Sequence, residues 1–409
     1  MKYVFSFYLS LISIFCFGQY THKDFNNDLD FVYENLKKSA SYKTLRNKHK
    51  VIDNKYVELK ESGITYGILD SYVKLYSLVD EVDDYHNEIY GNTPSFKYED
   101  LKDELFLTDI LNEPRYNFYP KSTKNLDSLE TVLSKKVLTD YEGIYYYKEY
   151  FKLAIVQKST TIFEGIILDT KIPSWQPGET ILYLVYKGNN RFRLFSGKFI
   201  DKQLISTIDY FRAGRFLSLN WEKERAATDY YNVGFLTETF TKKKLNAECI
   251  YIKLGSFNSS SKGIKEATAF YNSIKGNLQS KNLILDLRNN SGGGDKSSAQ
   301  FYNLFKKFKG NIYILVNFNT ISNAEQFTLK MKKLNNVMVL GDNTRGMITY
   351  GRNYAVDKVS PSAFFRIHFT DLDTHWREYL PYEGKGVTPN YYLSSTEDWV
   401  EQVAREYCK

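Results

Sequence analysis

Ser322 stands where a serine can act as a nucleophile. An apolar run at residues 312–316 predicts a strand before it, and residues 317–321 form the loop between the two. After the serine, apolar side chains recur at intervals of three and four, which predicts a helix: Ala324, Phe327, Met331 and Leu334. The first N–H groups of a helix have no partner within it, so they can stabilise an oxyanion beside the serine. The alternative is that Ser322 only caps this helix.

A glycine-rich turn lies upstream of this corner. Residues 282–287 read NLILDL, a nearly continuous apolar run that predicts a strand buried on both faces of a parallel sheet. Gly292, Gly293 and Gly294 follow shortly after this strand. Glycine adopts positive φ readily and lets bare N–H groups approach a ligand that a Cβ atom would exclude.

Together, these motifs closely resemble peptidase family S41, the tail-specific and tricorn-type proteases with a crotonase-like catalytic core. The family patterns D-L-R-x-N-x-G-G, T-x-S-A-A-E and G-x-x-T-x-G are similar to residues 286–293, 320–325 and 341–346. The resemblance covers residues 249–389. It implies that Ser322 is the nucleophile and that backbone N–H groups of Asn323, Gly292 and Gly293 form the oxyanion hole.

A serine hydroxyl needs a base to take its proton. The tail-specific branch uses a lysine just after the T-x-G turn, where this chain has Met347, which cannot accept a proton. The tricorn-like branch uses an upstream histidine in a D-x-H loop, and residues 84–86 resemble that loop. We therefore expect His86 to be the base. His368 and His375 are alternatives, and a lone histidine is often only structural.

A carboxylate is expected to orient this histidine. Residues 383–389, EGKGVTP, resemble the family's closing E-G-x-G-[IV]-x-P segment, which makes Glu383 the residue that fixes the imidazole and stabilises the imidazolium. The alternative is a surface glutamate in a glycine-rich turn. Tyr85 departs from the family, in which a small hydroxyl residue or glycine can stand beside the histidine.

Composition bounds the remaining possibilities. The chain has 409 residues, with 43% hydrophobic and 16% aromatic content, which is ample for two or three domains with hydrophobic cores. The net charge of +7 is spread thinly, and the longest basic run, residues 242–244, has no interleaved aromatic residues. Nucleic acid is therefore not an expected partner. No metal-binding, P-loop or Rossmann motif is present, and the expected chemistry needs no metal or cofactor.

The N-terminal segment predicts export. Residues 1–19 combine an early lysine, an apolar run and small or polar residues at Gly18 and Gln19, as in a secretory signal peptide. No later stretch is long and apolar enough to predict a transmembrane segment. Removal of this peptide leaves Cys249 and Cys408, which are enough for one bridge in an oxidising compartment but not for a disulfide scaffold or a zinc site.

Four segments are expected along the chain: a signal peptide at residues 1–19, an N-terminal helical domain at 20–138, a β-rich inserted domain at 139–226 and an S41-type catalytic domain at 227–409. Short strands separated by turns favour an antiparallel barrel or sandwich for the insert, and its last expected strand spans residues 215–221. No PDZ-like carboxylate loop is found there. A loop containing Pro94, Pro114 and Pro120 interrupts the helical pattern, and we expect it to cross the active-site cleft.

The sequence therefore predicts a secreted or periplasmic serine endopeptidase that acts on peptide or protein substrates. Its expected fold class is an α/β crotonase-like catalytic domain with an N-terminal helical region and an inserted antiparallel β domain. The alternative is a catalytically inactive relative that binds peptide or polysaccharide through the β domain. Tyr85 and Met347 favour this alternative because both depart from residues that active relatives have.

Overall fold

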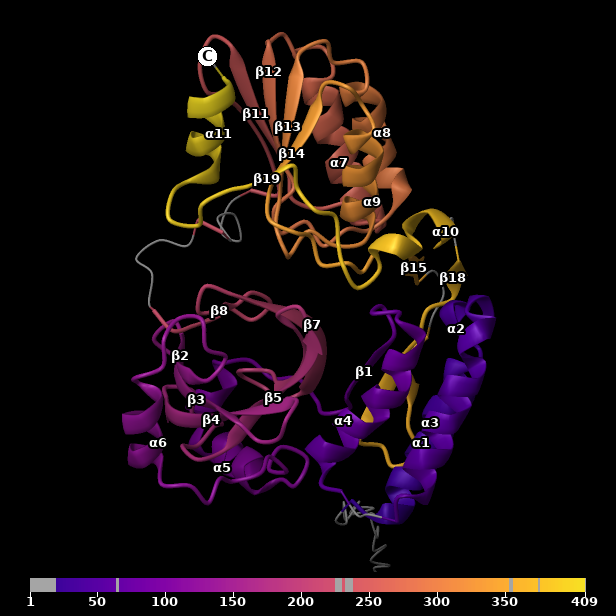
Figure 1. Ribbon diagram of the computed structural model, residues 1–409, viewed down its shortest axis with the longest axis vertical. Coiled ribbons are helices and arrows are strands. Elements are labelled where there is room, and N and C mark those ends of the chain that lie inside the picture. The colour runs from indigo at the N-terminus through magenta and orange to yellow at the C-terminus, as the bar shows by residue number, and fades with distance from the viewer. Residues whose placement is uncertain are drawn as a thin grey trace, which may run out of the picture.

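The computed structural model describes residues 20–63, 66–224, 230–231, 238–352, 356–373 and 376–408. A helical region, a β barrel and a parallel sheet with flanking helices lie around a common centre (Figure 1). The segment expected to be a signal peptide and the alternative base His375 lie outside the described residues. No helix of the described residues is long and apolar enough to span a membrane.

The first helices follow the apolar periodicity of the sequence. They are α1 (His22–Leu36), α2 (Ala40–Thr44), α3 (His49–Glu61) and α4 (Ile68–Val79), with 3-10 turns η1 (Arg46–Lys48) and η2 (Asp80–Val82). One face of α4 is buried through Leu69, Tyr72, Leu75, Tyr76 and Val79. These side chains belong to the same hydrophobic core as the interior of the barrel. The helical region and the barrel are therefore packed together rather than joined only by a linker.

Three short strands connect this region to the far end of the chain. Strand β1 (Glu88–Gly91) pairs antiparallel with β17 (Phe365–His368), which in turn pairs with β16 (Lys358–Val359). The register places Glu88 opposite His368. This long-range pairing holds the segment that follows His86 against the C-terminal part of the chain.

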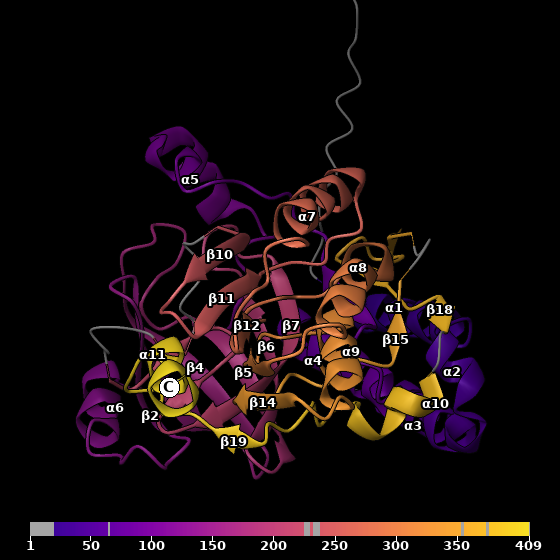
Figure 2. The ribbon, with the colours of Figure 1, turned by 90° about the horizontal axis from the view of Figure 1, so that it is seen from above.

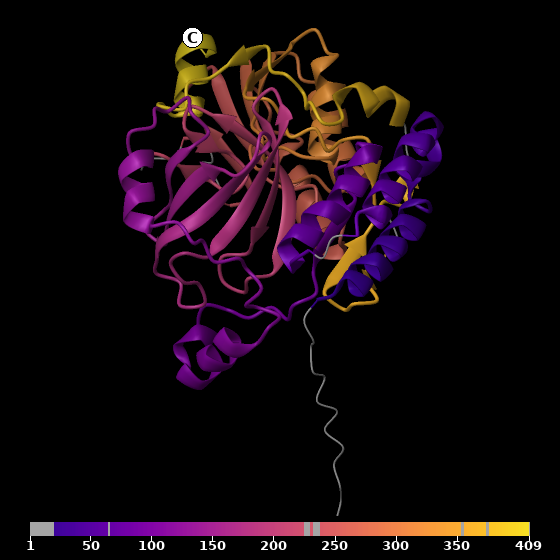
Figure 3. The ribbon, with the colours of Figure 1, turned by 60° about the horizontal axis from the view of Figure 1, so that its bottom comes forward.

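The proline-containing loop does not cross the cleft. It contains η3 (Asp100–Lys102) and α5 (Glu104–Asn112), which project away from the body of the molecule (Figures 2 and 3). After it, Pro120 accepts a hydrogen bond from the N–H of Thr180 in the barrel, and α6 (Leu126–Leu133) packs on the barrel wall through Leu133. The expectation was wrong, because no residue of this loop lines the cavity beside Ser322.

The β-rich insert is a closed antiparallel barrel, one of the two architectures expected. Its strands are β2 (Gly143–Tyr147), β3 (Phe151–Gln157), β4 (Ile162–Thr170), β5 (Thr180–Gly188), β6 (Arg191–Gly197), β7 (Leu204–Arg212), β8 (Arg215–Phe216) and β9 (Trp221–Glu222). Large aromatic side chains such as Phe192, Phe216 and Trp221 are fully buried in the core. The strand expected over residues 215–221 is instead the two short strands of a hairpin, β8 and β9.

The C-terminal region is built on a six-stranded sheet in the order β10-β11-β12-β13-β14-β19. These strands are β10 (Phe240–Lys244), β11 (Cys249–Leu254), β12 (Asn282–Asp286), β13 (Asn311–Val316), β14 (Val337–Gly341) and β19 (Tyr391–Tyr392). All neighbours are parallel except β10 and β11. The buried parallel strand expected at residues 282–287 and the strand expected at residues 312–316 are thus confirmed.

Helices cover both faces of this sheet. Helices α7 (Ser261–Ile274), α8 (Asp295–Phe305) and α9 (Asn323–Lys332) pack on one face, and α11 (Trp399–Tyr407) packs on the other (Figure 1). Side chains alternate accordingly, with Leu283 and Leu285 in the core under α7 to α9, and Ile284 in the core with α11. That second core also includes Ile208 of the barrel.

The last segments close the fold. They include β15 (Tyr350–Gly351), β18 (Leu372–Asp373), α10 (Trp376–Tyr379) and η4 (Leu380–Tyr382). A disulfide joins Cys249, the first residue of β11, to Cys408 at the end of α11, with 5.6 Å between the Cα atoms. The bond ties the C-terminal helix to the sheet.

Candidate active site

Ser322 lies at the corner between β13 and α9, as the sequence predicted. Its backbone has φ 57° and ψ −123°, a conformation that residues with a side chain rarely adopt. Its N–H donates to Oε2 of Glu325 at 2.9 Å. A serine held in a strained turn at the start of a helix presents its hydroxyl outward from the backbone, which suits a nucleophile.

His86 approaches this serine from the helical region. The chain leaves η2, passes Asp83 in a left-handed conformation and enters β1 two residues after the histidine. Nε2 of His86 lies 3.2 Å from Oγ of Ser322, although the two residues are 236 positions apart in the sequence. The imidazole is nearly buried, with 12% of its side chain exposed. The structure thus brings together the two residues on which the expected chemistry depends.

Burial determines the charge of His86. Removal from water, followed by the positive charge of Arg352, lowers the pKa of His86 to about 3. Arg352 also donates from Nε to the backbone oxygen of His86 at 3.0 Å, so the arginine holds the loop while opposing protonation of the ring. At neutral pH the imidazole is uncharged, and Nε2 can accept the serine proton.

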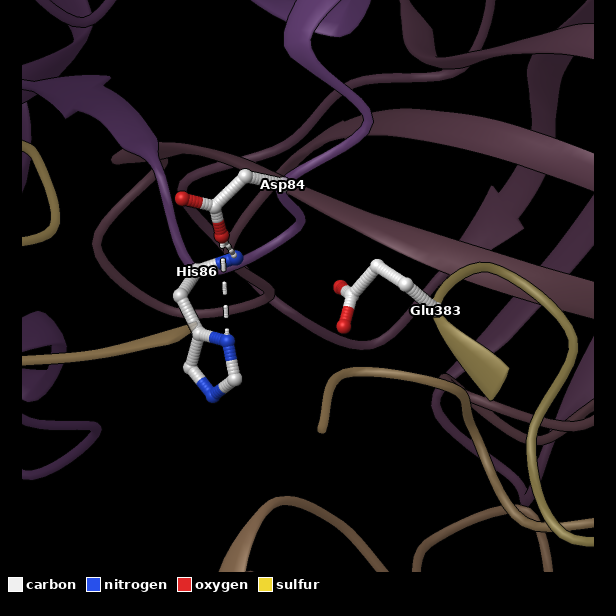
Figure 4. Close-up of side chains that lie close together, drawn as sticks. All are labelled: Asp84, His86 and Glu383. Carbon is white, nitrogen blue, oxygen red and sulfur yellow. Dashed lines mark hydrogen bonds and ion pairs between the residues drawn. The ribbon is translucent and has the colours of Figure 1, made fainter. Parts of the chain in front are cut away.

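Two carboxylates lie near the other ring nitrogen (Figure 4). Nδ1 of His86 is 3.9 Å from Oδ1 of Asp84, and the ligand atoms of Asp84, His86 and Glu383 all lie within 4.8 Å of one another. Asp84 also accepts a hydrogen bond from the N–H of His86 at 3.0 Å. Nδ1 itself is buried and has no hydrogen-bond partner among the described residues.

Glu383 is held by the backbone rather than by the histidine. Its Oε2 accepts the N–H groups of Ile348 at 2.9 Å and Thr349 at 2.8 Å. Burial, and then the negative charge of Asp84, raise the pKa of Glu383 to about 8. Burial also raises the pKa of Asp84. Because its pKa is about 8, Glu383 holds a proton near neutral pH.

Asp84 is therefore a site residue to which sequence reasoning assigned no separate role. The D-x-H pattern contained it, and that pattern was the available signal. The same three side chains could also hold a metal ion. Among the described residues, no other group of three or more possible metal ligands lies this close together. Both carboxylates already accept backbone N–H groups, which suits side chains that orient a neighbour.

The glycine turn faces the serine. Gly292 has φ 86°, and a Cβ atom there would lie 2.6 Å from the backbone oxygen of Ile321 and 2.9 Å from Cβ of Ser322. Its N–H donates to Oδ1 of Asn290 at 2.9 Å. Gly293 and Asn323 line the cavity beside the serine, and no hydrogen bond from their N–H groups is found among the described residues. These two N–H groups are thus the ones available to an oxyanion.

Glu325 organises the turn around the serine, a role that the sequence did not reveal. The side chain is fully buried, which raises its pKa. Besides the N–H of Ser322, it accepts Oγ1–H of Thr344 at 2.5 Å and the N–H groups of Gly346 at 2.7 Å and Met347 at 3.1 Å. The start of α9 and the turn at residues 344–347 are therefore fixed by one carboxylate. The T-x-S-A-A-E pattern already contained this residue.

Tyr85, the departure from the family, has a packing role. Its ring lies 5.1 Å from the guanidinium of Arg193, and a Cβ atom on Gly384 would approach the ring to 3.0 Å. Arg193 belongs to the barrel and also donates from Nε to Asp80 of η2 at 3.0 Å. The larger residue beside the histidine is thus accommodated by the barrel and does not displace His86 from Ser322.

The site opens into a cavity of about 490 Å³. Its wall includes His86, Ser322, Gly293, Asn323 and Met347, together with Ser206 and Thr207 of barrel strand β7. The barrel therefore forms part of the site. The alternative base His368 is engaged elsewhere, since its Nδ1 lies 2.8 Å from Asp357.

The chain is similar to known proteins in sequence and in structure. Residues 248–309 and 302–393 match the model of Peptidase family S41. No curated protein matches the sequence. Among the solved structures that are similar to this chain, the next three have low identity and TM-scores under 0.5.

The photosystem II D1 C-terminal processing protease has 12% identity and a TM-score of 0.41, with 94% of this chain and 97% of that chain covered. A putative peptidase from Parabacteroides merdae has 13% identity and a TM-score of 0.38, with 93% and 92% covered. The tricorn protease has 13% identity and a TM-score of 0.43, with 93% of this chain and 35% of that chain covered. The family model thus shows that the region at residues 248–393 is similar to peptidase family S41.

Proposed function

We propose that the chain is a serine endopeptidase in which Ser322 is the nucleophile and His86 the general base. The observation that carries the proposal is the 3.2 Å approach of Nε2 of His86 to Oγ of Ser322. A neutral imidazole at hydrogen-bond distance from a serine in a strained turn is the arrangement that nucleophilic catalysis needs.

The reaction uses both ring nitrogens of His86. Nε2 takes the hydroxyl proton while Oγ of Ser322 bonds to the scissile carbonyl carbon, and the carbonyl oxygen becomes an oxyanion. The N–H groups of Gly293 and Asn323 donate to that oxyanion. The imidazolium then gives its proton to the leaving amine, and the acyl-enzyme forms. Water hydrolyses this ester by the same steps, with His86 again as base.

The two carboxylates act on the imidazolium. When Nε2 takes the proton, Nδ1–H becomes the donor of a charged ring and turns towards Asp84 or Glu383. The family pattern favours Glu383 in this role. The electrostatics disfavour Glu383 as a charged partner near neutral pH, because burial and the charge of Asp84 raise its pKa to about 8. We propose that both are positioning residues and that neither contacts the substrate.

The architecture and the sequence also support a division into domains and a location outside the cytoplasm. The parallel sheet with α7 to α9 on one face supports a crotonase-like catalytic domain over residues 227–409, with a helical domain at 20–138 and the barrel at 139–226 packed against each other through one hydrophobic core. The apolar stretch at residues 1–19 and the disulfide between Cys249 and Cys408 support a secreted or periplasmic location.

The second candidate function is a catalytically inactive S41 protein that binds peptide or polysaccharide. Met347 favours it, because the residue lies in the cavity wall at the place of the family's lysine and cannot act as a base. The contact between His86 and Ser322 favours the active enzyme, since a binding protein has no need of that pair.

Labelling with a serine-directed fluorophosphonate tests the proposal. We expect the wild type to be labelled at Ser322 and the Ser322→Ala variant not to be labelled. With a peptide substrate, Ser322→Ala, His86→Ala and the double variant should each lower turnover by about 10⁴- to 10⁶-fold, without additivity, because the two residues act as one unit. His368→Ala is the control and should retain turnover. An unlabelled, correctly folded wild type would favour the inactive alternative.

A further inference from the structure

Positive charge is concentrated at the edge of the parallel sheet opposite to Ser322. Strands β11 to β14 begin at this edge, whereas Ser322 and the glycine turn follow the ends of such strands. Four segments of the chain reach it: residues 242–249, 275–282, 306–311 and 332–337. These segments contain ten lysines and one acidic residue, Glu248. Their net charge of +9 exceeds the +7 of the whole chain.

Backbone hydrogen bonds join the four segments into one surface. At the start of three strands, an N–H group donates to a backbone oxygen of the adjacent segment at 2.8 to 2.9 Å: Asn282 to Glu248, Asn311 to Lys281 and Ile312 to Asn336. The segments therefore lie side by side, at the end of the sheet farthest from the barrel (Figure 1). We call the surface formed by these four segments the basic edge.

Most of the positive charge of the basic edge is not compensated within the protein. Four of the ten lysines have partners, since two form ion pairs and two donate to backbone oxygens: Lys281, Lys333, Lys242 and Lys332. The other six are exposed and make no ion pair with any described residue: Lys243, Lys244, Lys275, Lys306, Lys307 and Lys309. Helix α11 ends beside this edge and adds Arg405 and Glu406, which leave the excess unchanged. A concentration of like charge attracts a surface of opposite charge.

An exposed leucine lies among these lysines. Leu245 directly follows Lys243 and Lys244 in the turn between β10 and β11. The N–H groups of Leu245 and Asn246 donate to the backbone oxygen of Cys249 at 3.0 and 3.4 Å, which fixes the turn. Leu245 is 38% exposed. An apolar side chain beside flexible ammonium groups suits the interface of a lipid bilayer, where the leucine contacts the acyl boundary and the lysines contact the headgroups.

The composition of the basic edge favours a membrane over a nucleic acid. Phe308 is its one aromatic residue and is buried, so no ring of this surface is exposed to stack on a base. The four segments contain no arginine, the residue that makes most bidentate contacts with guanine. A layer of anionic headgroups requires only a sufficient density of positive charge.

We propose that the basic edge binds the protein to the surface of a membrane that contains anionic lipids. Each lysine near such a surface strengthens binding by about fivefold, so the six unpaired lysines are sufficient without any specific contact to one lipid. None of them lines the cavity beside Ser322. Because the basic edge and Ser322 lie at opposite ends of the sheet, the cavity of the bound protein faces away from the membrane and stays open to substrates. This inference does not depend on the proposed peptidase chemistry.

Sedimentation with lipid vesicles tests the proposal. The protein is mixed with vesicles of phosphatidylcholine that contain about 30% phosphatidylglycerol, and with vesicles of phosphatidylcholine alone. At about 0.1 M salt we expect binding to the anionic vesicles to be at least about 100-fold tighter than binding to the neutral ones. An increase to about 0.5 M salt should weaken binding to the anionic vesicles by about tenfold or more, because ions screen the lysines.

Variants assign the binding to the basic edge. A triple variant with Lys306→Gln, Lys307→Gln and Lys309→Gln should bind the anionic vesicles about 100-fold more weakly, at about fivefold for each lost charge. The matched control removes three exposed lysines elsewhere and should bind as the wild type does: Lys97→Gln, Lys135→Gln and Lys171→Gln. Leu245→Ser should weaken binding by about 3- to 10-fold and leave its salt dependence unchanged.

Several results would overturn the proposal: no binding to the anionic vesicles, equal binding to neutral vesicles, or equal losses in the two triple variants. Tighter binding to a DNA duplex than to the anionic vesicles would assign the basic edge to nucleic acid instead. Phosphonate labelling of both triple variants should proceed at the wild-type rate, since these lysines lie away from the cavity. An unlabelled wild type that binds the vesicles would contradict the peptidase function and leave the membrane surface supported.

Discussion

The parallel sheet and the barrel contribute to the same cavity in different ways. The sheet brings Ser322 and the glycine turn to the ends of β13 and β12, in segments that the family motifs identify. The barrel carries no such motif, yet it places Ser206 and Thr207 in the cavity wall. The family motifs therefore locate the residues that we propose to react. The shape of the cavity depends also on the barrel, which no motif marks.

The barrel also holds parts of the site in position. NH2 of Arg191 in β6 donates to the backbone oxygen of Arg345 at 2.6 Å. Two residues further along β6, Arg193 binds Asp80 of η2, close to the loop that carries His86. The turn at residues 344–347 and the histidine loop are thus both fixed to one barrel strand. An insert that only screened substrates would not need these contacts.

We expect the largest effect on labelling from the loss of Arg191, whose hydrogen bond joins β6 to the turn at residues 344–347. Arg191→Ala leaves the carbonyl of Arg345 without its donor, beside the turn that Glu325 connects to Ser322. We expect the loosened turn to lower the rate of phosphonate labelling by about 10- to 100-fold, the range that corresponds to one lost hydrogen bond from a charged donor.

The control for Arg191→Ala is Lys124→Ala. Lys124 pairs with Glu164 on the outer surface of the barrel, at 2.6 Å between Nζ and Oε1, and 42% of its side chain is exposed. We expect wild-type labelling for this variant. Equal labelling rates for Arg191→Ala and the wild type would mean that the barrel lies beside the catalytic region without supporting its geometry.

The same contrast explains how much the sequence could predict. The helix after Ser322 and the strands before it are local patterns, and the structure has them where expected. The pairing of Glu88 with His368 has no local signal, because register between distant strands depends on the whole fold. The place of Thr207 in the cavity wall could not be identified either, since tertiary packing alone brings this strand to the cavity.

The charge state of the histidine cluster was also beyond the sequence. An imidazole in water has a pKa near 6.5, and with no structure in hand there is no reason to expect another value. Burial and Arg352 lower the pKa of His86 to about 3, and burial and Asp84 raise that of Glu383 to about 8. Burial and the nearest charges, which set both shifts, are known only once the chain is folded.

A pH profile with Glu383→Gln tests this cluster, and we expect a moderate effect. Glutamine resembles the protonated glutamate that predominates below about pH 8, so turnover at pH 7 should fall by less than about tenfold. Activity requires neutral His86, and protonation of this imidazole should lower activity only as the pH falls towards 3, below the range of an ordinary histidine. Any loss at a higher pH would come from Asp84, whose pKa is raised by burial. In the wild type, ionisation of Glu383 above pH 8 should alter turnover, whereas the variant should lack that alkaline change.

The control for this profile is Glu397→Gln, a change at a half-exposed carboxylate that pairs with Arg405. It should reproduce the wild-type profile at both ends. If Glu383→Gln lowers turnover at pH 7 as strongly as His86→Ala, then Glu383 carries the charge that stabilises the imidazolium, and Asp84 does not.

The disulfide should have the smallest effect on turnover, because it lies at the opposite end of the sheet from the reacting groups. Cys249 begins β11, whereas Ser322 and the glycine turn follow the ends of parallel strands. Cys408→Ser opens a loop that spans 159 positions and should lower the free energy of unfolding by roughly 2 to 5 kcal/mol. Denaturant unfolding measures this loss, and phosphonate labelling of the folded variant should proceed at the wild-type rate.

The comparison with Arg191→Ala makes this last result informative. Both variants can lose stability, but only Arg191 contacts the turn that supports Ser322. While the protein remains folded, a loss of stability alone should not slow the labelling of either variant. A slow rate found only for Arg191→Ala would therefore show that the barrel supports the site. If Cys408→Ser slows labelling to the same extent, the sheet transmits changes from its far end to Ser322, and the barrel has no special role.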